Sequence, residues 1–161
     1  MRPNKMKKVL IALDYNPTAQ KVAEAGFSMA KSMNAEITLL HVITDPVFYS
    51  TSGYSPIMGF NGYIDMGPTQ LDSIDGLKNA SLQYLDKSKQ HLGDKTIQTI
   101  VKEGDFADAI LETAEEIHAN IIVVGSHSRK WLENIVMGSV TEKVLHHTSI
   151  PLLIVPTKKR D

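Results

Sequence analysis

The apolar positions of the chain form five short runs, separated by longer amphipathic stretches. The runs are rich in branched residues and lack regular alternation with polar residues, which is typical of strands covered on both faces of a parallel sheet. They are VLIAL (9–13), ITLLHVI (37–43), IQTIV (97–101), IIVV (121–124) and IPLLIV (150–155). We therefore predict five strands.

Helical periodicity fills the intervals between these runs, with apolar or small residues three or four positions apart. The predicted faces run from Val22 to Met33, Ile74 to Leu92, Phe106 to Ile117 and Val140 to Leu145. Alternating strands and helices predict an open α/β sheet with right-handed crossovers and helices on both faces. No repeat or linker divides the chain, so we expect one domain over residues 1–161.

Cap signals mark the helix starts. The candidate pairs are Asn16 with Pro17, Asp105 with Asp108, and Ser139 with Glu142. Asparagine followed by proline suits a cap and first turn, and the other two pairs have the spacing of a cap and its reciprocal partner.

One segment, residues 46–71, breaks the alternation. It is rich in aromatic residues and carries a single charge, Asp65. Connections of this length in compact domains are usually lids, binding loops or disordered pieces. A loop that packs on a partner and a mobile insertion both fit this composition.

Composition narrows the function classes. Of the 161 residues, 42% are hydrophobic and 22% are charged, and the formal net charge is −1, so no global field would attract nucleic acid or an anionic membrane. The absence of cysteine excludes disulfides and thiolate sites. The first apolar run is too short for a signal peptide or a membrane span, so we expect a cytoplasmic protein.

Two glycines bracket the candidate site. Gly125 follows the fourth strand, and Gly138 precedes Ser139 and the last helix. Ligands of open α/β sheets bind beyond the carboxyl ends of the strands, and free N–H groups at a helix start attract anions. A glycine at a strand end permits close approach of a ligand or a positive φ. The segment therefore predicts a phosphate pocket, whereas the dinucleotide and P-loop glycine patterns are absent.

The same residues carry a resemblance. Gly125, Ser128, Gly138 and Ser139 have the spacing of the G-x2-G-x9-G-[ST] motif found in nucleotide-binding universal stress proteins. The stretches KKVLIALD, ITLLHV, VKEGDFADAILETAEE and GSVTEKVLHHTSIPLLIVP are similar to that family as well. The chain thus resembles a universal stress protein over nearly its whole length.

This resemblance implies an adenine nucleotide alpha hydrolase-like sheet of order 3-2-1-4-5, a homodimer and ATP binding. The nucleotide-binding residues it implies are Ala12, Leu13, Asp14, Val42, Val124, Gly125, His127, Ser128, Gly138, Ser139, Val140 and Thr141. Ser128 departs from the family motif, because it replaces the middle glycine. If that position needs a positive φ, serine costs about 1 kcal/mol more than glycine, and its hydroxyl could either crowd or bond a phosphate.

Asp14 is the candidate ligand for a Mg²⁺ or Mn²⁺ ion on the phosphates, since hard cations prefer carboxylate oxygens. Its alternative role is to cap the first helix, for which Asn16 is better placed. His41, on an apolar strand, is expected to be a hydrogen-bonded core residue. No carboxylate pair or nucleophile–base pair stands out, so we expect a nucleotide sensor or switch with slow hydrolysis at most.

The last strand indicates the partner. Its apolar edge, limited by Pro151 and Pro156, would be covered by pairing with its copy in a second chain. We expect a homodimer that acts on a regulatory protein, with no nucleic acid and no membrane as partners. Two alternatives stay open: a nucleotide-independent dimeric interaction protein that docks through residues 46–71, and a slow ATPase.

Overall fold

A computed structural model describes residues 5–14, 18–43, 74–126 and 138–157 of the chain. Its elements alternate as the apolar pattern predicts. They are β1 (Lys8–Ala12), α1 (Ala19–Ser32), β2 (Glu36–Ile43), α3 (Ile74–Leu92), β3 (Gln98–Glu103), α4 (Phe106–Glu116), β4 (Ile121–Gly125), α5 (Ser139–His147) and β5 (Leu152–Val155). Every predicted strand and helix is present, with ends displaced by a few residues at most.

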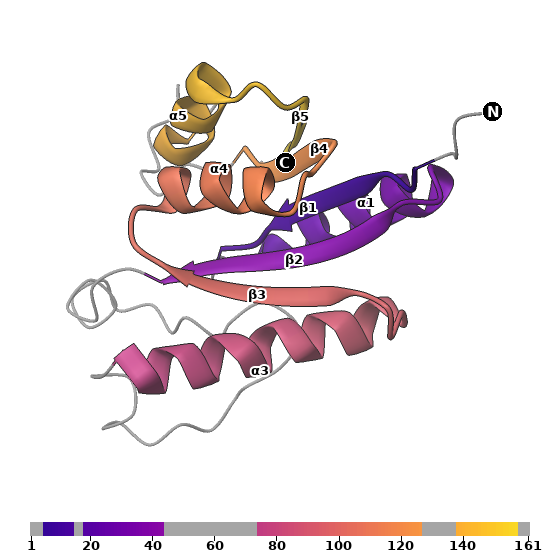
Figure 1. Cartoon of the computed structure of the whole chain (residues 1–161). Helices are drawn as coiled ribbons and strands as arrows, with labels where there is room; N and C mark the ends of the chain where they lie inside the picture. The colour runs from indigo at the N-terminus through magenta and orange to yellow at the C-terminus, as the bar shows by residue number, and fades with distance from the viewer. Residues whose placement is uncertain (1–4, 15–17, 44–73, 127–137, 158–161) are drawn as a thin grey trace, which may run out of the picture.

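The strands form one parallel sheet in the order β3-β2-β1-β4-β5, as the resemblance implied (Figure 1). The central strand, β1, pairs with β2 on one side and with β4 on the other; Val9 lies opposite both Ile37 and Ile121. The chain leaves β1 in one direction for β2 and β3, and later returns to the other side for β4 and β5. The carboxyl ends of β1 and β4 therefore lie at the topological switch point.

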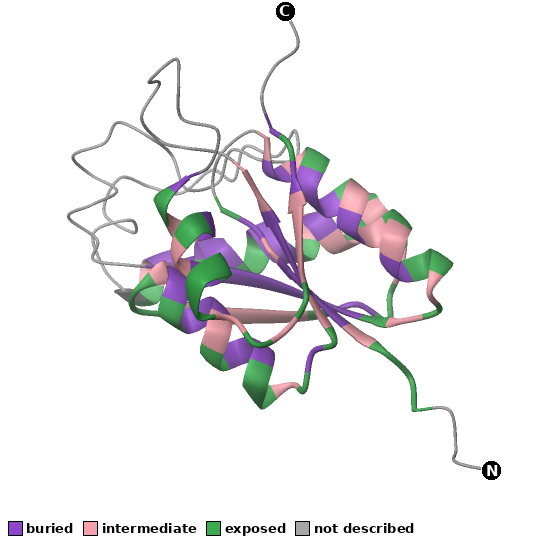
Figure 2. Cartoon of the chain, turned by 90° about the horizontal axis from the view of Figure 1, so that it is seen from above, coloured by how far each residue is buried: buried purple, intermediate pink, exposed green. Residues whose placement is uncertain are grey.

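Helices cover both faces of the sheet. Figure 1 shows α4 and α5 on one side and α3 on the other, and α1 packs on the same face as α3. Consecutive side chains of β1 point to opposite faces of the sheet. Val9 and Ile11 pack with α1 and α3, and Leu10 packs with α4. The buried residues accordingly follow the sheet and the inner sides of the helices (Figure 2). This double coverage explains why the strands lack polar alternation.

The helix starts confirm one predicted cap and overturn another. Asp105 caps α4, since its carboxylate accepts a hydrogen bond of 3.0 Å from the backbone N–H of Asp108. The predicted cap at Ser139 is wrong: Gly138 is the N-cap residue of α5, and Ser139 is the first helical residue. Thr18 is the N-cap residue of α1, while Asn16 and Pro17 lie outside the described residues, as does the segment 46–71.

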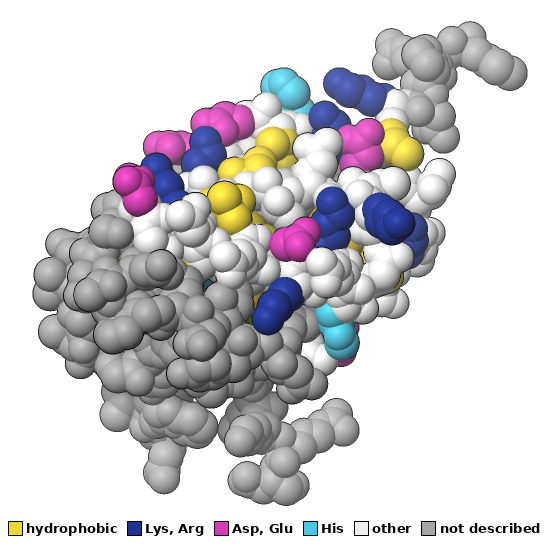
Figure 3. Space-filling view, turned by 90° about the horizontal axis from the view of Figure 1, so that it is seen from below, with side chains coloured by type: hydrophobic (Ala, Val, Ile, Leu, Met, Phe, Trp, Pro, Cys, Tyr) yellow, Lys and Arg dark blue, Asp and Glu magenta, His cyan; other side chains and the backbone are white. Residues whose placement is uncertain are grey.

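The described surface carries charges of both signs. Seen from below, Lys side chains stand beside Asp and Glu side chains (Figure 3). None of the helices in the described ranges is long and apolar enough to cross a membrane. Leu145, which the helical pattern placed on the apolar face of α5, is instead exposed.

Gly104 turns the chain from β3 into α4. Its φ of +125° lies outside the narrow left-handed region that L-residues tolerate, and its N–H donates to the Ile43 carbonyl at the end of β2 (3.0 Å). Glycine is thus needed at position 104 because only glycine adopts this φ without strain. Its hydrogen bond also joins the end of β3 to the end of the neighbouring strand β2.

We predict that Gly104→Ala costs about 2 to 3 kcal/mol in the free energy of unfolding, and that Gly93→Ala costs about 1 kcal/mol. A Cβ at either glycine meets no atom within 4 Å, so backbone strain is the only term that differs. Gly93, with a φ of +73°, is close to the left-handed minimum and serves as the matched control. Urea denaturation measures both losses; equal losses would contradict the assignment.

Candidate functional site

The candidate site lies where the carboxyl end of β4 meets the start of α5. The N–H of Gly138 donates to the carbonyl of Ser126 over 3.0 Å, so the N-cap residue of α5 is bonded to the residue that follows β4. The two glycines of the sequence motif are thereby brought to one edge of the sheet. Between them, His127 and Ser128 lie outside the described residues.

The first turn of α5 supplies donors at this edge. The first helical hydrogen bond runs from the Glu142 N–H to the Gly138 carbonyl (2.9 Å). The amide groups of Ser139, Val140 and Thr141 precede that bond and belong to the N-terminal end of the helix, where the helix dipole is positive. This end of α5 is therefore suited to an anion.

The side chain of Thr141 joins α5 to the end of β4. Its hydroxyl donates to the Gly125 carbonyl over 2.7 Å, and the residue is only 3% exposed. The hydroxyl proton is thus committed to the backbone of β4 and is not available to a phosphate, which only accepts hydrogen bonds. Thr141 can offer a ligand its backbone N–H.

Ser126 has a structural role that the sequence analysis missed. Its N–H donates to the Val155 carbonyl (2.9 Å), its carbonyl accepts from Gly138, and its Oγ accepts from the buried Thr157 N–H (3.0 Å). One residue therefore joins β4, α5 and the segment after β5. Nothing in the local sequence marks Ser126 or Thr157, because their contacts depend on the pairing of β4 with β5.

Gly125 is required for packing. A Cβ on it would lie 2.9 Å from Cγ2 of Val22 and 3.1 Å from Cγ2 of Thr157, closer than side-chain carbons normally approach. Its φ is not positive, which excludes one of the two reasons that the sequence analysis gave for a glycine here. Gly138 likewise has an ordinary extended conformation, with a φ of −70°. Neither glycine is needed for an unusual backbone angle.

The end of β1 forms the other side of the site. The Leu13 N–H donates to the Leu40 carbonyl (2.8 Å), and Asp14 follows as an exposed residue. Ala12 is half-buried, whereas the side chains of Leu13, Val42 and Val124 are packed in the core. These three residues therefore have only backbone groups to offer a ligand.

His41 is buried beside this strand end. Its Nδ1 lies 2.7 Å from the Leu13 carbonyl, and because a carbonyl only accepts, Nδ1 carries the proton. Its ring meets that of Tyr84 edge to face, with centroids 5.6 Å apart. Nε2 has no hydrogen-bond partner among the described residues, so within them the expectation of a satisfied core histidine holds for one nitrogen only. Burial lowers the pKa of His41 despite the Leu13 hydrogen bond and the charge of Asp14, which both oppose the shift.

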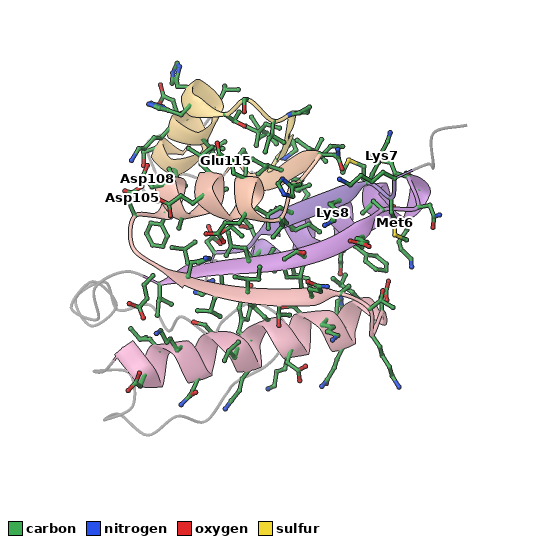
Figure 4. The ribbon with its side chains drawn as sticks, in the orientation of Figure 1. Met6, Lys7, Lys8, Asp105, Asp108 and Glu115 are labelled. Atoms are coloured by element: carbon green, nitrogen blue, oxygen red, sulfur yellow. The ribbon has the colours of Figure 1, made fainter. Side chains whose placement is uncertain are left out.

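Two carboxylates at the carboxyl edge of the sheet, those of Asp105 and Asp108, form ion pairs with Lys143 of α5. Asp105 and Asp108 lie together at the start of α4, far from Lys7 and Lys8 at the opposite end of the sheet (Figure 4). Lys143 contacts both carboxylates, at 3.0 and 3.1 Å. The Asp108 N–H and then Lys143 lower the pKa of Asp105.

The described residues do not contain a group of side chains that could bind a metal ion by themselves. Within the described ranges, no group of three or more His, Asp or Glu side chains could hold a metal ion. An ion at Asp14 would therefore need further oxygen ligands from water or from a bound molecule.

Comparison with known proteins agrees with this architecture. The model of the Universal stress protein family matches residues 5–156. The chain belongs to the universal stress protein family. It is 31% identical over 151 residues to Universal stress protein YxiE of Bacillus subtilis, covering 92% of this chain and 97% of YxiE.

Solved structures of family members share the fold. The structure of MJ0577 from Methanocaldococcus jannaschii superposes with a TM-score of 0.71 at 25% identity, over 96% of this chain and 98% of MJ0577. A universal stress protein in complex with cAMP gives a TM-score of 0.62 at 17% identity, over 95% and 98% of the two chains. At that identity the likeness concerns the fold alone.

We predict that His41 makes the free energy of unfolding depend on pH. In the unfolded chain its pKa takes the ordinary value of 6.5, and in the folded chain it is lower. The stability is then complete above pH 6.5 and falls as the pH decreases through that value, because only the unfolded state binds the proton. The slope contributed is at most about 1.4 kcal/mol per pH unit.

Urea denaturation between pH 5 and 8, a range chosen around the histidine pKa of about 6.5, measures this slope against that of His41→Asn, which has no titrating group at position 41. The exposed histidines are common to both proteins and cancel in the difference. Parallel curves for the two proteins would contradict the prediction.

Proposed function

We propose that this universal stress protein binds ATP at the carboxyl edge of its sheet, as a ligand or switch rather than as a rapidly hydrolysed substrate. The observation that carries the proposal is the start of α5, held against the end of β4 by the Gly138–Ser126 and Thr141–Gly125 hydrogen bonds. A helix start fixed in this way presents its amides without reorganisation. The spacing of Gly125, Ser128, Gly138 and Ser139, which resembles the motif of nucleotide-binding universal stress proteins, supports an adenine nucleotide as the ligand.

The phosphates would lie on the amides of Ser139, Val140 and Thr141, with Gly125, His127 and Ser128 on the facing side. The base would lie against the backbone of β1 and β2, near Ala12, Leu13 and Val42. Val124 supports this edge from the core. A divalent ion, Mg²⁺ or Mn²⁺, would join the phosphates to the Asp14 carboxylate. One exposed carboxylate plus nucleotide oxygens is the usual way in which proteins hold Mg²⁺, so the residue fits this role.

The described residues favour binding over catalysis. The nitrogen of His41 that could accept a proton from water is Nε2, and it is buried in a residue only 1% exposed, so His41 is not placed to activate water. Asp105 and Asp108 are engaged by Lys143. A site that holds phosphates without a positioned base would bind ATP and turn it over slowly at most.

We predict that ATP with Mg²⁺ binds the purified, nucleotide-free protein saturably in the micromolar range, measured by calorimetry. Gly138→Asp should weaken binding at least about a hundredfold, because a carboxylate at the N-cap competes for the first-turn amides and repels phosphate. Aspartate is a good N-cap residue, so α5 itself should not be destabilised.

Gly138→Asn is the matched control, since it caps the helix similarly without the charge. The difference in affinity between the two variants isolates the electrostatic part. No heat up to millimolar ATP in the wild-type protein would overturn the proposal and favour a nucleotide-independent interaction protein.

We also propose that the protein is a homodimer through the segment from Pro151 to Pro156, which contains β5. β5 ends the sheet order, and Leu152, Leu153 and Ile154 are only partly buried, although they pack against the core. An apolar strand at a sheet edge presents unpaired backbone groups, and a second copy would satisfy them. The dimer would be the unit that a regulatory protein partner recognises.

Sedimentation at micromolar concentration should show two chains in the wild-type protein. Leu152→Lys should weaken dimerisation at least about tenfold, because it places a charge on the apolar edge. Leu82→Lys, which changes a 46% exposed leucine on α3, should leave the mass unchanged. A wild-type monomer would contradict the dimer.

A further inference from the structure

Two buried side chains from different elements hold the end of β1. We propose that His41 and Tyr84 are positioning residues that fix the backbone at Leu13 and Asp14, so that the Asp14 side chain leaves the backbone in one direction, toward the bound nucleotide and its ion. This inference rests on the proposed nucleotide site and assigns it two residues that do not touch the ligand.

His41 anchors the first of the two carbonyls. It comes from β2, is 1% exposed, and donates from Nδ1 to the Leu13 carbonyl over 2.7 Å. The N–H of Leu13 is also bonded, to the Leu40 carbonyl at 2.8 Å. Both backbone polar groups of the residue before Asp14 are therefore tied to β2.

Tyr84 anchors the second carbonyl. It comes from α3, is 2% exposed, and donates its hydroxyl to the Asp14 carbonyl over 3.1 Å. Burial raises the pKa of Tyr84, so the hydroxyl stays protonated and remains a donor. The edge-to-face contact with His41, with ring planes 73° apart, fixes the two donors relative to each other.

Hydrogen bonds to the carbonyls of Leu13 and Asp14 restrict the backbone where the chain leaves the sheet after β1. The Cα–Cβ direction of Asp14 follows from those peptide planes, although its side chain is exposed. A carboxylate held in place by a rigid backbone binds an ion with less loss of conformational freedom than one on a free loop.

The partnerless Nε2 of His41 supports this assignment. A buried acceptor that finds no partner among the described residues is unfavourable there, and an apolar side chain in the same place would avoid that cost. What an apolar residue could not supply is the hydrogen bond to Leu13. The histidine is thus explained by its anchoring contact and not by packing alone.

A double-mutant cycle tests the proposal, with the affinity for ATP and Mg²⁺ measured by calorimetry. Tyr84→Phe removes only the hydroxyl and should weaken binding about fivefold, the equivalent of one hydrogen bond. In an Asp14→Ala background the same substitution should have no further effect, because there is no carboxylate left to position. Thr113→Val is the matched control: it removes a buried hydroxyl that donates to the Ala109 carbonyl (2.7 Å) on α4, and should leave the affinity unchanged.

His41 provides a second, independent pair of variants. Asn offers an amide N–H close to the position of Nδ1, so His41→Asn should keep the wild-type affinity, whereas His41→Leu should lose about fivefold. This pair also serves if Tyr84→Phe does not fold.

The outcomes separate the two claims. Wild-type protein that does not bind ATP overturns the proposed function, and this inference with it. Wild-type protein that binds ATP, with Tyr84→Phe and His41→Leu equally tight, overturns the positioning role alone. The same holds if Tyr84→Phe weakens binding equally with and without the Asp14 carboxylate.

Discussion

The burial of β1 on both faces is the constraint on which the rest of the structure depends. Val9, Leu10 and Ile11 are fully buried, and consecutive side chains enter opposite layers of the core. A strand of this kind must lie inside the sheet with helices above and below. Once β2 and β4 flank it, the chain diverges at its carboxyl end, and the switch point of the fold is set there.

The candidate site follows from that position, but its shape is set by hydrogen bonds around it. Ser126 ties the end of β4 to α5 and to Thr157, and Thr141 adds a second tie between α5 and Gly125. On the other side, His41 and Tyr84 hold the end of β1. The first-turn amides of α5 and the backbone at Asp14 are therefore held by hydrogen bonds from several elements.

Much of the fold could be read from the apolar pattern. The five strands and four helices of the described residues, and the cap at Asp105, were predictable because each depends on residues close together in the sequence. The sheet order and the site residues required the family resemblance, since pairing between distant strands has no local signature. Ser139 shows the limit of local reasoning. Its spacing to Glu142 matches a capping box, yet the N-cap residue is Gly138, which is bonded to Ser126, and Ser139 is already helical.

The sequence by itself determined the alternation of strands and helices, the double burial of the sheet, and the two glycines at its carboxyl edge. The tertiary structure alone decided what those glycines and their neighbours do. Gly125 has no room for a Cβ because Val22 and Thr157 lie close to it. His41 and Tyr84 bond to Leu13 and Asp14, from which they are separated by 28 and 70 positions in the sequence. The reason is physical: local periodicity records which side of an element is buried, whereas a hydrogen bond between distant segments exists only after the sheet has brought their ends together.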